Sequence, residues 1–124
     1  MEEKKYDLEE RTLLFAIAVR NLVKILPRTI SNIEDMKQIV RSSASVGANY
    51  IEANEALSKR DFVHRIKICK KEAKETIFWL RLLRPQNESS FFGQIDDLLQ
   101  EAKELLLILG SIYQKASQSL EFRD

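Results

Sequence analysis

Hydrophobic residues recur along this chain at intervals of three and four, in four segments separated by short polar stretches. The segments cover about residues 8–26, 32–56, 59–84 and 91–117, and two of them stop just before Pro27 and Pro85. Proline disfavours helical geometry in the residue that precedes it, so both prolines indicate helix ends. Short connections place sequential helices antiparallel. The pattern predicts an all-α protein: one domain over residues 1–124, folded as an antiparallel, up-down-up-down four-helix bundle.

Short polar side chains stand where these helices are expected to begin. We predict Asp7, Asn32 and Ser58 as the N-caps of the first three helices, and Ser89 or Ser90 as that of the fourth. A side-chain oxygen at this position accepts a hydrogen bond from a backbone N–H that the helix leaves free.

The third segment divides into an apolar and a basic face. One face is expected to enter the core and carries Phe62, Ile66, Cys69, Ala73, Ile77 and Leu80. The opposite face carries Arg60, His64, Lys67, Lys71, Lys74 and Arg81. Residues spaced in this way share one side of a helix, which predicts that the basic residues are exposed to solvent.

Two helices carry more apolar surface than one core requires. The runs Leu13–Val19 and Leu105–Leu109 are apolar throughout, and five residues already sweep about 500° around a helix. Helices that are apolar on all sides are buried on more than one side. We therefore expect the protein to self-associate. Burial of Leu14, Ile17, Leu106 and Ile108 within a single copy would remove the basis for that expectation.

A stripe of small and amide side chains follows the second helix and includes Gln38, Arg41, Ser45, Asn49 and Glu52. A stripe with few long charged side chains favours close contact with another helix, in a polar network within or between subunits. Arg41 would pair with Glu52 or with a carboxylate of another helix; the alternative is a stripe that faces water. Gly47 interrupts the helix at a cost of up to about 1 kcal/mol, which indicates a close approach of two backbones, a kink, or simple tolerance.

The composition indicates the kind of partner and the cellular location to expect. There are 20 basic and 19 acidic residues, so no globally electrostatic choice of partner is implied. The single Cys69 excludes an internal disulfide framework and agrees with a reducing compartment. The apolar runs are shorter than the roughly 20 residues of a membrane span, and the charged start, 1–10, does not resemble a leader. We expect a soluble, cytoplasmic protein with no membrane partner.

Catalytic and metal chemistry find little support. His64 is the single histidine, and only Asp61 precedes it at carboxylate-x-x-His spacing, whereas a di-iron bundle needs such a pair on two helices. Arg60 lies closer to His64 than the four to six intervening residues typical of four-helix toxin RNases. Cys69 lies on the core stripe, where a thiol behaves as a small hydrophobe. We predict no catalytic residue, metal or cofactor, and therefore no enzyme.

Positive charge is concentrated locally. Seven Lys or Arg and only two acidic residues occur between Lys59 and Lys74, whereas Asp96–Glu104 contains four acids and one Lys. A basic helix face can follow a phosphate backbone, with binding that weakens steeply as salt increases. The candidate nucleic-acid-binding residues are Arg60, His64, Lys67, Lys70, Lys71, Lys74 and Arg81. The alternative is a solvated face that maintains solubility.

The stretches QIVRSSASVGANYIEANEALSKRDF and KICKKEAKETIFWLRLL resemble a family, the bacterial four-helix-bundle proteins related to those encoded in 23S ribosomal RNA intervening sequences. The matching polar positions are Gln38, Arg41, Ser45, Asn49, Glu52 and Glu75. Ser58, Asp61 and Phe62 match the family's junction between the second and third helices.

The resemblance implies a helical bundle that assembles, commonly as a pentameric ring. A similar protein, the accessory variability determinant of diversity-generating retroelements, binds nucleic acid and a reverse transcriptase through a basic surface. The expected function is a non-enzymatic, oligomeric interaction module for RNA, DNA or a nucleic-acid enzyme. The alternative is a structural or protein-binding scaffold without nucleic-acid contact.

Overall fold

Two of the predicted helix caps are confirmed in the computed structural model, which describes residues 7–123, the side chains of 121–123 excepted. The first helix, α1, covers Leu8–Ile25, and the Asp7 carboxylate accepts a hydrogen bond of 3.2 Å from the Glu10 N–H. The third helix, α3, covers Lys59–Leu83, and the Ser58 hydroxyl accepts from the Asp61 N–H at 3.1 Å. Both boundaries follow from local capping chemistry.

The cap predicted for the second helix is wrong. Helix α2 covers Ile30–Asn54, and its N-cap is Thr29, whose hydroxyl accepts from the Asn32 N–H at 3.1 Å. The Asn32 side chain is instead buried and donates to the Pro27 carbonyl at 2.8 Å and to the Asn87 side-chain oxygen at 2.7 Å. Asn32 therefore connects the start of α2 to the turn between the third and fourth helices.

The fourth helix begins and ends later than the pattern predicts. Two short 3-10 helices, η1 (Arg84–Gln86) and η2 (Ser89–Phe91), precede α4, which covers Phe92–Arg123. Ser89 and Ser90 thus lie inside a 3-10 turn instead of capping α4. The helix continues past residue 117, where it was expected to end, because no Pro or Gly interrupts the polar segment that follows.

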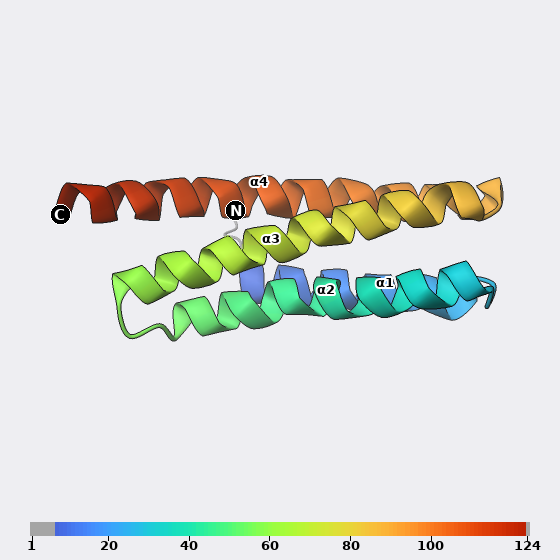
Figure 1. The fold of residues 1–124 in the computed structure, drawn as a ribbon, viewed down its shortest axis with the longest axis horizontal. Coiled ribbons are helices and arrows are strands. Elements are labelled where there is room, and N and C mark those ends of the chain that lie inside the picture. Colours follow the sequence, from blue (N-terminus) through green and yellow to red (C-terminus); the bar gives the residue numbers. More distant parts are fainter. Residues whose placement is uncertain (1–6, 124) are drawn as a thin grey trace, which may run out of the picture.

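Sequential helices run antiparallel, which confirms the up-down-up-down four-helix bundle (Figure 1). Helix α3 lies between α2 and α4 and packs against both, whereas α1 lies behind α2 and packs mainly against it. No strand occurs between residues 7 and 123. The bundle is elongated, and the last turns of α4 extend beyond the other three helices.

The core consists of two hydrophobic clusters along this axis. All four helices contribute to the first cluster, which includes Phe15, Leu22, Ile39, Leu80 and Leu105. Only α2, α3 and α4 contribute the buried residues of the second: Val46, Ala53, Ile66, Cys69, Ala73 and Leu109. Helix α1 has 18 residues against 25 in α2 and in α3, and although its Glu9 accepts a hydrogen bond of 2.9 Å from Asn54, it does not extend as far as the end of the bundle where α3 begins (Figure 1). The start of α3 therefore belongs to the half built from three helices.

A single copy leaves apolar side chains of two helices in solvent. On α1, Leu13 is 53% exposed, Leu14 is 55% exposed and Ile17 is 45% exposed. On α4, Leu107 is 74% exposed, whereas Leu106 and Ile108 are half-buried. The prediction that one four-helix core cannot bury these runs is confirmed. Gly47 is explained within one copy, because α2 passes α1 closely at Thr12.

Candidate nucleic-acid interface

The solvent-facing side of α3 carries a row of basic residues. Because Ile66, Cys69, Ala73, Thr76 and Leu80 are buried on the opposite side, the positions between them face outward. Six candidates from the sequence are exposed and follow a spacing of four and three: Arg60, His64, Lys67, Lys71, Lys74 and Arg81. We call this row the α3 basic row. No carboxylate belongs to it.

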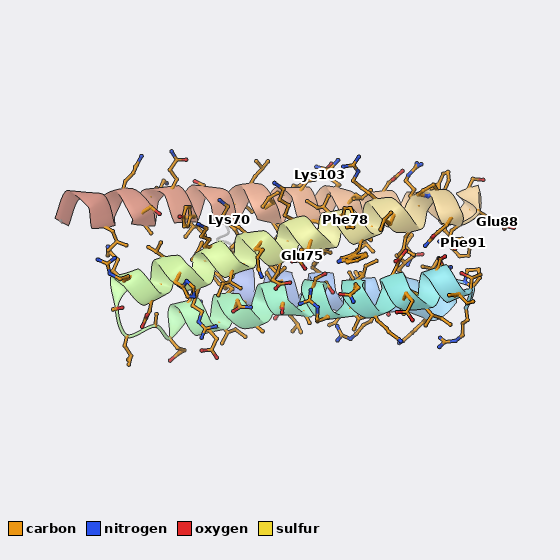
Figure 2. All side chains as sticks on the ribbon, viewed as in Figure 1. Lys70, Glu75, Phe78, Glu88, Phe91 and Lys103 are labelled. Atoms are coloured by element: carbon orange, nitrogen blue, oxygen red, sulfur yellow. The ribbon has the colours of Figure 1, made fainter. Side chains whose placement is uncertain are left out.

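The seventh candidate, Lys70, lies beside the row and not within it. Its side chain is half-buried, and its ammonium nitrogen lies 4.6 Å from the ring centre of Tyr113 on α4. The Lys67 ammonium nitrogen lies 5.9 Å from the same ring. Such cation–π contacts contribute about 0.5–1 kcal/mol at exposed sites. These contacts hold two ammonium groups against α4 at the edge of the row. Figure 2 shows Lys70 between α3 and α4.

An aromatic residue that the sequence reasoning missed interrupts the row. Phe78 fills the turn between Lys74 and Arg81, continues the four-three spacing, and is 55% exposed. Its ring packs edge-on against Trp79, with 5.1 Å between the ring centres. The sequence itself indicates that Phe78 is exposed, because Phe78 shares the register of the basic residues and not that of the core stripe.

Two hollows border the middle of the basic row. The larger has a volume of about 610 Å³ and is lined by His64, Lys67, Ile68, Lys70, Lys71, Lys74 and Leu106. The smaller, of about 250 Å³, is lined by Lys71, Lys74, Glu75, Phe78 and Trp79. Lys71 and Lys74 border both. Much of the lining consists of lysine stems and apolar side chains, so the hollows combine apolar walls with charged rims.

Carboxylates close to the row are turned toward α2. The Arg41 guanidinium donates to Glu72 at 3.2 Å and to Glu75 at 2.8 Å. Only 8% of the Glu72 side chain is exposed, and the Lys71 ammonium nitrogen approaches it at 3.8 Å. Of the two alternatives predicted for Arg41, the structure shows a pairing with carboxylates of another helix and not with Glu52. Arg41 of α2 thus binds both of these α3 carboxylates, and within the row Lys71 also approaches Glu72.

The polar stripe of α2 faces α3, so the interhelical interpretation holds for its central part. The Arg65 guanidinium donates to the Asn49 side-chain oxygen at 3.1 Å, and Asn49 donates to the Ser45 carbonyl at 2.9 Å. One turn away, the buried hydroxyls of Ser42 and Thr76 lie 2.7 Å apart. At the two ends of the stripe, Gln38 and Glu52 are exposed.

Acidic residues of α4 are engaged by arginines outside the basic row. Arg11 forms a bidentate pair with Glu101, at 2.7 and 2.9 Å, and a further bond of 2.8 Å to Glu104. Hydrogen bonds from Gln100 and Arg11 lower the pKa of Glu104. The Glu101 bond raises the pKa of Arg11. These ion pairs join α1 to α4.

Catalytic chemistry gains no support from the geometry. His64 is exposed on the basic row, whereas Cys69 is fully buried beneath it, so the two do not form a nucleophile and base. Burial raises the pKa of the Cys69 thiol to about 12. Within residues 7–123, no three His, Cys, Asp or Glu side chains are grouped so that they could hold a metal ion. None of the helices in the described part of the chain is long and apolar enough to cross a membrane.

The protein is thus a small antiparallel four-helix bundle with a basic face on α3 and a polar contact between α2 and α3. The model of the 23S rRNA-intervening sequence protein family matches residues 4–111, and the chain belongs to this family. It is similar to a crystal structure of a protein of unknown function from the S23 ribosomal protein family of Bacteroides thetaiotaomicron. The two share 33% sequence identity and a TM-score of 0.72, over 85% of this chain and 96% of that chain. The comparison with curated proteins finds no match.

Proposed function

We propose that this protein is a non-enzymatic interaction module that binds nucleic acid through the α3 basic row. One observation carries the proposal: six basic side chains occupy one exposed helix face, and Arg41 of α2 binds the nearby carboxylates of Glu72 and Glu75. The described residues offer no grouping suited to catalysis, which agrees with a binding role. A cytoplasmic location belongs to the same proposal.

Helix geometry makes the row suitable for a phosphate backbone. From Arg60 to Lys74 consecutive members lie three or four residues apart, about 4.5–6 Å along the axis, and Arg81 follows Lys74 after seven residues, about 10.5 Å. Each lysine or arginine that neutralises a phosphate releases a condensed counterion, and this release favours binding. Because the protein as a whole is nearly neutral, the attraction depends on this face and not on the net charge.

Fluorescence anisotropy with labelled RNA and DNA oligonucleotides at increasing salt tests the proposal. The double variant Lys67→Glu plus Lys71→Glu should lose at least tenfold in affinity, and its dependence on salt should become shallower. Lys24→Glu plus Lys37→Glu is the matched control, because it makes the same charge change on α1 and α2. Equal binding by both double variants and the wild type would overturn the proposal and favour a protein-binding scaffold. Absence of binding by the wild type at low salt would also overturn the proposal.

Self-association is the second part of the proposed function, and we infer that the partner is another copy of this chain. A groove of about 420 Å³ between α1 and α2 has a floor of small residues, Ala16, Ala44, Gly47 and Ala48, and exposed apolar walls at Leu13, Ile17 and Ile51. The same chain exposes Leu14 and Leu107, which supply side chains of a size that fits such a groove. The family resemblance favours a pentameric ring, in which the basic row is repeated and binding gains avidity.

Light scattering coupled to size-exclusion chromatography tests the assembly. The wild type should have the mass of an oligomer at micromolar concentration, and Leu13→Glu plus Ile17→Glu should shift it toward a monomer that remains helical by circular dichroism. Glu10→Lys plus Asn21→Lys provides a control, because it adds charge to exposed α1 positions without removing apolar surface. A monomeric wild type would exclude self-association but leave the nucleic-acid proposal to its own test.

A further inference from the structure

We propose that the α3 basic row binds single-stranded nucleic acid, and that Phe78 stacks on an unpaired base. This inference rests on the proposed function and specifies the form of the ligand. Lysine and arginine alone would suit a duplex and a single strand equally, since both present phosphates. The aromatic ring within the row distinguishes the two.

Phe78 has the position required of a stacking platform. It is 55% exposed although it is one of the large apolar residues, and it lies on the same helix face as its basic neighbours. Lys74 precedes it by one turn, about 6 Å along the axis, and Arg81 follows at about 4.5 Å. A base stacked on the ring would thus have a cation on each side for the adjoining phosphates.

The ring is also fixed in orientation. Its edge-on contact with Trp79, at 5.1 Å between centres, supports it from the side of the core. Trp79 itself is half-buried, and its indole N–H is buried without a hydrogen-bond partner. A ring held in place loses little conformational freedom when a base stacks on it, which favours binding.

The hollows beside the row fit unpaired bases better than a paired helix. They have apolar walls, including Ile68 and Leu106 in the larger and Phe78 and Trp79 in the smaller. Lys71 and Lys74 stand on the ridge between them, where a backbone could follow the ammonium groups while bases turn inward. In a duplex the base faces are stacked on one another and inaccessible. Single-strand-binding proteins combine a basic track with aromatic platforms in this way.

The full-length protein supplies its own reporter, because Trp79 is the only tryptophan. Emission of Trp79 should be quenched by an unlabelled single-stranded oligonucleotide, since the stacked base would lie against the ring that contacts the indole. A blunt duplex of the same sequence should bind at least tenfold more weakly and quench less. Anisotropy measured in parallel gives the affinities without relying on the indole.

Variants at Phe78 separate stacking from apolar contact. Phe78→Ala and Phe78→Leu should each lose about tenfold in affinity for the single strand, whereas Phe78→Tyr should retain it, because stacking on an aromatic ring stabilises a bound base. Leu82→Ala is the matched control, as it removes another exposed apolar side chain of α3. Circular dichroism and light scattering should find all four variants folded and with the oligomeric mass of the wild type.

The outcomes distinguish this inference from the proposed function. If duplex and single strand bind equally, or if Phe78→Leu binds like the wild type while the lysine double variant does not, the single-strand inference is overturned and the proposed function stands. A change of oligomeric mass on Phe78→Ala without loss of binding would assign the ring to a contact between copies and also overturn it. Absence of binding to either form would overturn both.

Discussion

Gly47 of α2 lies so close to Thr12 of α1 that a Cβ built on the glycine would meet the threonine hydroxyl oxygen at 2.8 Å. That hydroxyl cannot easily move, because Thr12 is buried and donates to the Leu8 carbonyl at 2.8 Å. Gly47→Ala should therefore destabilise the protein by about 1–2 kcal/mol, as overpacking outweighs the gain in helix propensity. Denaturant unfolding at fixed protein concentration measures the difference.

Gly110 provides the matched control for that substitution. It also lies within a helix, but a Cβ there would meet nothing within 4 Å. Gly110→Ala should stabilise the protein by up to about 1 kcal/mol through helix propensity alone. If the two alanine variants shift stability in the same direction, the close approach at Thr12 does not constrain the fold.

The amide pair of Asn32 and Asn87 should be costly to break. Each side-chain amide donates to the oxygen of the other, at 2.7 and 3.0 Å, and Asn32 is fully buried. Asn32→Ala would leave the Asn87 amide and the Pro27 carbonyl without these partners, which should cost about 2–3 kcal/mol. Denaturant unfolding tests this, with the exposed Asn21→Ala as control. Equal stability of the two variants would contradict the prediction.

The ion pair between Arg84 and Asp96 makes part of the stability depend on pH. Two hydrogen bonds of 2.8 and 2.9 Å from the guanidinium lower the pKa of Asp96 below its ordinary value of 3.8. A lowered folded-state pKa contributes stability above the unfolded-state value, and this contribution is lost as pH falls through the folded-state value. Asp96→Asn should thus reduce the unfolding midpoint at neutral pH and have little effect in acid below the lowered pKa.

Asp97→Asn controls for the change of net charge, because Asp97 is an exposed neighbour on the same helix. Unfolding midpoints measured for both variants between neutral and strongly acidic pH should diverge only above the pKa of Asp96. A difference between Asp96→Asn and the wild type that is the same at every pH would contradict the ion-pair origin of the effect.

Cys69 should be chemically protected while the protein is folded. It is fully buried in the cluster formed by α2, α3 and α4, and its pKa is raised to about 12 by burial. Reaction needs the thiolate, so a disulfide reagent at mildly alkaline pH should label the folded protein far more slowly than the protein in concentrated guanidinium. Rapid and complete labelling under native conditions would show that this half of the bundle opens readily.

The fold could be predicted from the sequence because its signals are local. Apolar spacing, two prolines and the caps at Asp7 and Ser58 each act within a few residues. The failure at Asn32 has a tertiary cause, since its side chain bonds to Asn87, which lies 55 residues away. Similarly, no periodicity predicts that Arg11 pairs with Glu101, 90 residues further along the chain.

The candidate site was only partly predictable for a different reason. Charge and spacing identified the exposed basic residues of α3, but an exposed aromatic residue among them resembles a core residue in composition alone. Phe78 is distinguished by its register, which places it with Lys74 and not with Leu80. The pairing of Arg41 with Glu72 and Glu75 needed the packing of α2 on α3, which sequence spacing within one helix cannot supply.

The short length of α1 has a dynamic consequence. In the cluster to which α1 contributes no buried residue, the described part of the chain supplies six buried residues, and beyond Leu109 no side chain of α4 through residue 120 is fully buried. Backbone amides in that region are protected by few apolar contacts, so their hydrogen exchange should proceed through local opening at lower free energy than in the four-helix half. The terminal turns of α4 should thus fray and re-form at the expense of the Lys59–Ser119 hydrogen bond alone among the side-chain bonds described there, while the four-helix half stays folded.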